Sequence, residues 1–125
     1  MTSVTDRSYV HVAAGFLLMG IWAAFANRAH AMPAPLIAGL VQGTLTAGIT
    51  LGLKHMLEAL NRRLPGLSGL LIPPLLAGLA SVALLSTIHT LAATPEVLRT
   101  LAVPTTVATL YAAAYTWRLW SRTHG

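Results

Sequence analysis

Four long stretches that are almost free of charged residues constrain this chain more than any other feature. They cover residues 9–27, 35–53, 67–91 and 101–119. An α-helix crosses the roughly 30 Å hydrocarbon core of a bilayer with about 20 apolar residues and satisfies its own backbone hydrogen bonds there. We therefore predict an all-α polytopic membrane protein in which residues 1–125 form a single membrane domain. The predicted architecture is a bundle of four transmembrane helices, built as two helical hairpins.

The composition also indicates lipid as the main solvent. Hydrophobic residues make up 55% of the chain and charged residues only 9%, whereas about a quarter of a soluble domain is charged. The net charge of +5 is spread in small groups beside the apolar stretches, and no continuous basic stripe predicts nucleic acid as a partner. The absence of cysteine excludes disulfides, thiolate catalysis and zinc–thiolate sites.

Residues 54–63 are predicted to continue the second helix beyond the membrane. Lys54, Glu58 and Arg62 recur every four residues and therefore fall on one helical face, where ion pairs at this spacing stabilise a helix by about 0.2–0.5 kcal/mol each. The turn-forming residues 64–66 then end the helix.

The third stretch contains Pro73 and Pro74 in its first half, and the fourth begins close to Pro104. Each proline removes a backbone donor, so we expect the double proline to kink or locally open the third helix. In a bilayer this is tolerated where neighbouring helices cover the freed carbonyls. The prolines therefore predict a packed bundle.

Basic residues predict the orientation of the chain. One side would hold Arg7, Lys54, Arg62, Arg63, Arg118 and Arg122, and the other only Arg28 and Arg99. The positive-inside rule then places both termini on the cytoplasmic side of a multi-pass protein of the cell (inner) membrane. The aromatic residues agree, with Tyr9, Trp117 and Trp120 near the cytoplasmic interface and Trp22 near the opposite one. Five of the basic residues either contact anionic lipid headgroups or only determine the topology: Lys54, Arg62, Arg63, Arg118 and Arg122.

One alternative would shorten the protein to three spans. Residues 29–31, Ala-His-Ala, have the small-x-small form of a signal-peptidase site after an apolar run. Asn27 and Arg28 interrupt the approach to that site, and Asp6 beside Arg7 leaves the preceding region nearly neutral. We therefore favour four spans.

Small residues on the second helix predict close helix packing. Gly39, Gly43 and Ala47 form one row at intervals of four, and Thr44, Gly48 and Gly52 form an adjacent row. Such small-xxx-small faces allow backbones to approach closely in lipid. We favour packing within the chain over a dimer interface.

Gln42 is the one amide deep in a predicted span and needs a polar partner there. We favour an interhelical hydrogen bond to Thr105, Thr106 or Tyr111 over a ligand or water path. The alternative is a small polar crevice, lined by Gln42, Thr46, Thr105, Tyr111 and Tyr115.

Five histidines raise the question of a haem or metal site. His11 and His55 form one pair at similar predicted depth, and His30 and His89 form another. A bis-histidine haem needs ligands on different helices at matching depth. Because no ligand spacing supports a site, we expect solvated interfacial histidines, no cofactor and no metal.

The absence of certain residues and motifs narrows the range of possible functions. Asp6, Glu58 and Glu96 all lie outside the predicted spans, so the intramembrane carboxylate on which ion-coupled export usually depends is lacking. No nucleophile, zinc-protease or phosphate-loop motif is present, and we expect no enzyme. The favoured hypothesis is an accessory or structural subunit that packs against other membrane helices or against itself. The alternatives are an oligomeric small transporter or lipid-handling protein with a crevice around Gln42, and an intramembrane haem or quinone carrier.

Overall fold

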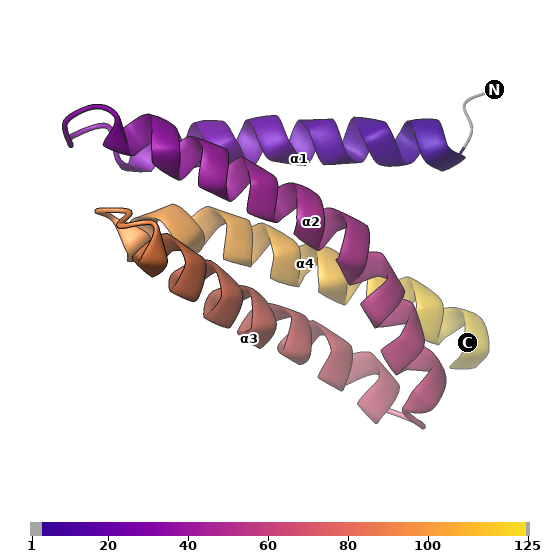
Figure 1. The fold of residues 1–125 in the computed structure, drawn as a ribbon. Helices are drawn as coiled ribbons and strands as arrows, with labels where there is room; N and C mark the ends of the chain where they lie inside the picture. The colour runs from indigo at the N-terminus through magenta and orange to yellow at the C-terminus, as the bar shows by residue number, and fades with distance from the viewer. Residues whose placement is uncertain (1–3, 125) are drawn as a thin grey trace.

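The protein consists of four α-helices joined by three short loops. The computed structural model describes the backbone of residues 4–124 and the side chains of residues 9–124. The helices are α1 (Val4–Ala26), α2 (Ala34–Arg63), α3 (Ser68–Leu91) and α4 (Val97–His124). Figure 1 shows that α1 begins, α4 ends and the α2–α3 loop lies at the same end of the molecule, with the start of α1 well apart from the other two. We call this the terminal end and the opposite one the loop end.

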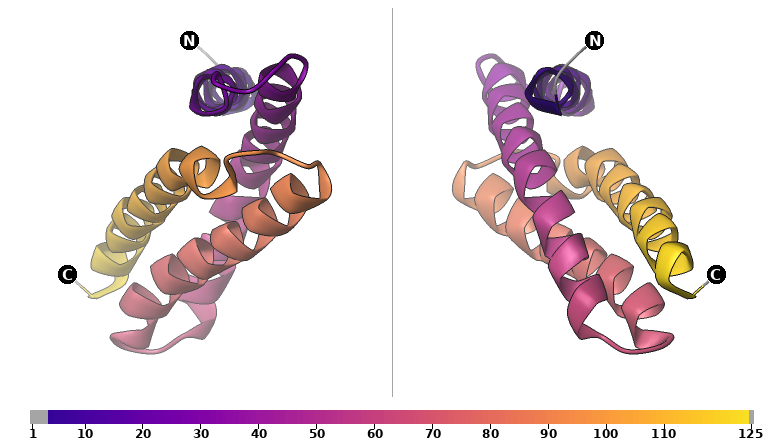
Figure 2. Two further views of the ribbon diagram at one scale, coloured as in Figure 1. Left: turned by 90° about the vertical axis from the view of Figure 1, so that its left-hand side faces the viewer. Right: turned by 90° about the vertical axis from the view of Figure 1, so that its right-hand side faces the viewer.

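The helices form two hairpins, α1–α2 and α3–α4, and α2 makes most of the contacts between them. The most extensive contacts are those of α1 with α2 and of α3 with α4, while α2 also contacts both α3 and α4. Within the described part of the chain, α1 touches α4 but not α3. Figures 1 and 2 show α1 and α4 close together at the loop end and diverging toward the terminal end. The bundle is therefore closed at one end and open on one side at the other.

The predicted set of helices is confirmed, with different ends for some of them. The extension of the second helix is confirmed, because α2 runs without a break to Arg63. The fourth helix begins earlier than predicted, at Val97, so that Pro104 lies two turns inside it. The expectation of a locally opened third helix is wrong, since α3 runs continuously through Pro73 and Pro74.

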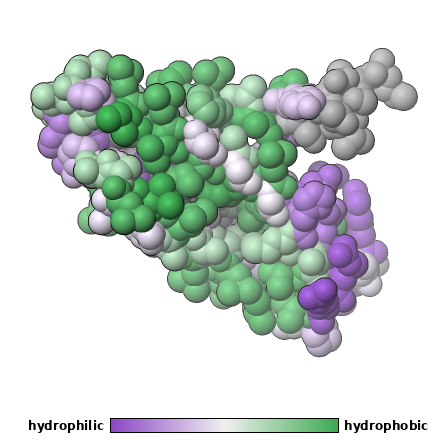
Figure 3. All heavy atoms as spheres, viewed as in Figure 1, coloured by the Kyte–Doolittle hydropathy of each residue, from purple (hydrophilic) through white to green (hydrophobic). Residues whose placement is uncertain are grey.

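Each helix is long and apolar enough to cross a membrane. No more than 22% of any of the four apolar windows is buried inside the molecule. The outer surface is therefore mostly hydrophobic, and Figure 3 shows hydrophilic residues gathered at the terminal end and, less densely, at the loop end. Such a surface is typical of a multi-pass membrane protein.

Glycines bring the backbones of α1 and α2 into contact. A Cβ on Gly39 would lie 2.9 Å from the carbonyl oxygen of Gly20, and a Cβ on Gly43 would lie 3.0 Å from that of Phe16. Neither position has room for a side chain. This part of the predicted packing row, Gly39 and Gly43, thus faces α1, and Ala47 one turn further on is half-buried.

Side chains from neighbouring helices cover two carbonyls that prolines leave without a donor. Pro73 cannot donate to the Gly69 carbonyl, and Asn61 Nδ2 of α2 donates to that oxygen at 3.1 Å. Pro104 cannot donate to the Thr100 carbonyl, and Trp22 Nε1 of α1 donates there at 3.0 Å. In α3 and in α4, a neighbouring helix therefore supplies a donor to one carbonyl that a proline leaves free.

Candidate functional site

A chain of polar side chains runs through the interior from the loop end. His89 of α3 is fully buried, and its Nδ1 lies 2.8 Å from the hydroxyl of Thr94 in the α3–α4 loop. Its Nε2 lies 2.8 Å from Oε1 of Gln42 on α2. The Gln42 amide donates in turn to Thr46 Oγ1 at 2.9 Å, one turn further along α2. These four residues join α2, α3 and a loop by hydrogen bonds in the interior of the bundle.

The orientation of the Gln42 amide sets the directions of the other hydrogen bonds. Gln42 Nε2 donates to Thr46, so Oε1 is free to accept and His89 Nε2 carries a proton. A neutral imidazole then has an unprotonated Nδ1, which accepts from the Thr94 hydroxyl. The network thus holds the amino group of Gln42 away from α3.

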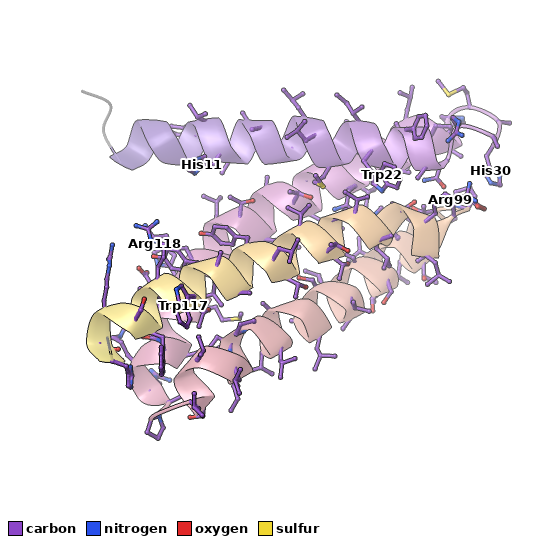
Figure 4. The ribbon with its side chains drawn as sticks, turned by 180° about the vertical axis from the view of Figure 1, so that it is seen from behind. His11, Trp22, His30, Arg99, Trp117 and Arg118 are labelled. Carbon is purple, nitrogen blue, oxygen red and sulfur yellow. The ribbon has the colours of Figure 1, made fainter. Side chains whose placement is uncertain are left out.

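Gln42 also lines a crevice between α1, α2 and α4. The crevice has a volume of about 350 Å³, and Leu85 of α3 closes part of its wall. Most of its lining is aliphatic, and its polar or small lining residues include His11, Gly15, Gln42, Thr46, Thr50 and Tyr111. Figure 4 shows His11 near the terminal end of α1, on the side of the helix that faces the bundle. The crevice therefore extends from the buried Gln42 toward the open part of the bundle.

The structure brings together some of the predicted polar residues and separates others. Gln42, Thr46 and Tyr111 line the crevice. Tyr115 stacks on Tyr111, with ring centroids 5.7 Å apart, but its hydroxyl donates to Glu58 of α2 at 2.8 Å. Thr105 is half-buried outside the crevice lining, and its hydroxyl has no partner among the described residues.

The predicted partner of Gln42 is wrong. None of Thr105, Thr106 and Tyr111 bonds to the amide; the interhelical partner is His89. The expectation that His89 is solvated is also wrong, because it is fully buried. One signal could have located it: the buried residues of α3 recur every four positions, as Gly69, Pro73, Ala77, Ser81, Leu85 and His89. This row of small and apolar residues ends on the histidine.

No family model, curated protein or solved structure matches the chain.

The other charged and titratable groups lie near the two ends of the bundle. The predicted ion pairs of Glu58 with Lys54 and Arg62 are absent among the described residues, because Glu58 turns toward Tyr115 and approaches His55 at 4.0 Å instead. All five basic headgroup candidates are exposed and lie in the last third of α2 or of α4: Lys54, Arg62, Arg63, Arg118 and Arg122. The side chains of Asp6 and Arg7 lie outside the described residues.

The pair of His30 and His89 does not have the arrangement that a bis-histidine haem requires. Both ring nitrogens of His89 are engaged in hydrogen bonds, and His30 approaches Glu96 at 3.3 Å in the exposed loops. Figure 4 shows His30 at the loop end beside Arg99, with Trp22 nearby, and Trp117 and Arg118 at the terminal end. In residues 9–124, no cluster of three or more metal-ligating side chains occurs.

A second hollow lies on the outside of the bundle, between α2 and α3. This groove has a volume of about 310 Å³ and is lined by Thr44, Gly48 and Gly52 of α2 and by Ala77, Ala80 and Ser81 of α3, among others. A Cβ on Gly48 or Gly52 would meet no atom within 4 Å. The second predicted packing row is therefore not used within the chain.

Proposed function

We propose that this chain is a non-enzymatic, four-span membrane protein that holds a lipid-phase molecule in the crevice between α1, α2 and α4, with both termini in the cytoplasm. The observation that carries the proposal is the crevice itself, an apolar hollow of about 350 Å³ with a fully buried amide in its wall. The proposal corresponds to the lipid-handling alternative that the sequence analysis considered.

Size and lining both support a ligand site. Small-molecule pockets typically enclose about 300–1,000 Å³ and combine a mostly apolar lining with a few well-placed polar groups. The crevice is lined by residues of α1 and α4, two helices that diverge toward the terminal end (Figure 2). In a bilayer, a molecule with a long apolar part can enter there directly from the lipid.

Filling the crevice tests the proposal. Ala108 lines the crevice, whereas Ala102, on the same helix, is exposed and lines no hollow. We expect Ala108→Trp to reduce labelling of crevice peptides by a photoactivatable fatty-acyl probe at least tenfold, on the order of the loss of 1.4 kcal/mol of binding free energy. Ala102→Trp, which adds the same side chain outside the crevice, should label as the unmodified protein does.

Peptide mass spectrometry locates the labelled residues. Labels concentrated on α1 and α4 residues that line the crevice support the proposal. Labels spread evenly over the outer faces of all four helices, with equal yields for both variants, would contradict it.

A second candidate function is the accessory subunit, and the uncovered groove between α2 and α3 favours it. Gly48 and Gly52 offer the flat surface on which a further transmembrane helix packs in lipid. We expect Gly48→Leu to reduce association in mild detergent, measured by light scattering after size-exclusion chromatography. Leu40→Ala, an exposed change on the same helix, serves as the control. A monomer in every sample, with no bound partner, would count against this function.

A further inference from the structure

The Gln42 amide has one hydrogen-bond donor that the protein does not use. Its Oε1 accepts from His89, and one Nε2 hydrogen is donated to Thr46. A primary amide has two such hydrogens, and the second has no acceptor among residues 9–124. The side chain is 0% exposed. A buried donor without a partner destabilises a structure, so an acceptor that reaches this hydrogen after a small shift of the surrounding crevice side chains is favourable there.

Two hydrogen bonds hold the Gln42 side chain in place. Nε2 faces Thr46, and Oε1 faces the Nε2 of His89, whose other ring nitrogen faces Thr94. Thr94 is itself buried, at 7% exposed, and sits on the α3–α4 loop. The crevice wall therefore contains an amide whose position is set by its contacts with His89 and Thr46.

Near Gln42 the crevice offers no charge to pair with a ligand's charge. None of the described residues that line it is Lys, Arg, Asp or Glu, and its one histidine, His11, lies near the terminal end of α1. An ionised group placed at Gln42 would be desolvated without a counter-ion, which is far less favourable than placing a neutral oxygen there.

We infer that the ligand is an uncharged lipid-phase molecule whose ester or ketone carbonyl oxygen accepts a hydrogen bond from the second Nε2 hydrogen of Gln42. This inference rests on the proposed function and specifies the ligand class for the same crevice. The aliphatic remainder of the molecule lies along α1 and α4, where Leu18, Val107 and Ala108 line the crevice.

Two probes of equal chain length test the carbonyl directly. Methyl palmitate carries the ester, and octadecane lacks it. In competition with the photoactivatable fatty-acyl probe, we expect the ester to bind about fivefold more tightly than the alkane, which is the effect of one ordinary hydrogen bond. Gln42→Leu should abolish this preference. Thr106→Val should retain it, because the exposed Thr106 hydroxyl lies outside the crevice lining and donates to the Ala102 carbonyl at 2.7 Å.

A spectroscopic measurement on the unmodified protein does not depend on whether Gln42→Leu folds. With a ¹³C label on the ester carbon, the carbonyl stretch of bound methyl palmitate should lie at lower frequency than that of the ester in hydrocarbon. A stretch at the hydrocarbon frequency, or an unchanged preference for the ester in Gln42→Leu, would overturn the inference and leave the crevice as a site for apolar chains. Failure of both probes to compete would overturn the proposed function as well.

Discussion

Two glycines on one helix show how strongly the role of a residue depends on its position. A Cβ added to Gly39 would lie 2.9 Å from the Gly20 carbonyl oxygen of α1, whereas a Cβ added to Gly48 would meet no atom within 4 Å. We expect Gly39→Ala to lower the free energy of unfolding by about 1–3 kcal/mol, because α1 must move away. Gly48→Ala should leave the free energy unchanged or raise it by up to about 1 kcal/mol, since alanine favours the helix. Unfolding in sodium dodecyl sulfate, followed by tryptophan fluorescence, measures both.

The two variants are matched in chemistry and in helix, so each is the control for the other. Equal losses of stability would mean that α1 does not lie against Gly39, or that a partner covers Gly48 in the detergent used.

The Gln42–His89 hydrogen bond should appear as energetic coupling between two residues 47 positions apart. Gln42→Leu and His89→Leu each leave the other side chain buried without its partner, and we expect each to cost about 1–3 kcal/mol. The double variant removes both polar groups and should cost less than the sum, with a coupling energy of about 0.5–3 kcal/mol. The same unfolding assay measures the cycle, and additive losses would contradict the contact.

At the scale of the element, prolines are accommodated by donors from outside the helix. We expect Asn61→Leu to cost about 0.5–1.5 kcal/mol, because the Gly69 carbonyl loses its only side-chain donor among the described residues. In a Pro73→Ala background the alanine N–H can bond to Gly69, so the same substitution should have little effect. A double-mutant cycle in the unfolding assay measures the difference.

Trp22 and Pro104 form an independent second case, since Trp22 Nε1 donates to the Thr100 carbonyl. Trp22→Phe should likewise lower the free energy of unfolding less in a Pro104→Ala background than in the unmodified protein. If both cycles are additive, the side-chain donors do not compensate for the prolines.

At the scale of the whole molecule, the arrangement of the ends gives a prediction for topology. The chain has no cysteine, so single cysteines report on individual sites. With α1–α4 spanning the membrane, Leu67→Cys and Thr123→Cys should react with an impermeant maleimide from the cytoplasmic side only, and Ala29→Cys from the opposite side only. Intact spheroplasts and inverted vesicles distinguish the two sides. Reaction of Leu67→Cys and Ala29→Cys from the same side would contradict the proposed topology.

The interior of the molecule is divided between its two ends. Toward the loop end it holds hydrogen-bonded polar residues, among them Asn27, whose Nδ2 donates to Thr100 Oγ1 at 2.7 Å and whose Oδ1 accepts from the Glu96 N–H at 2.9 Å. An apolar cluster of Leu53, Leu57, Ala77 and Ala112 joins α2, α3 and α4. The polar contacts tie α1 to the start of α4 at the loop end, and α1 diverges from α4 toward the terminal end (Figure 1).

The sequence by itself determined the number of helices and their approximate limits, because each stretch must be long and apolar enough to cross a membrane whatever its neighbours are. It also determined that Gly39 and Gly43 form a packing face, since residues four apart share one side of a helix. These properties depend on local spacing alone.

Only the tertiary structure decided which residues meet. The pairing of Gln42 with His89 and of Glu58 with Tyr115 depends on how α2 is rotated and tilted against α3 and α4. Periodicity tells which side of its own helix a residue lies on. It does not tell which residue of another helix lies opposite, and a hydrogen bond requires two atoms within about 3 Å of each other. For the same reason the open row at Gly48 and Gly52 could not be distinguished from the closed row at Gly39 and Gly43 before the helices were placed.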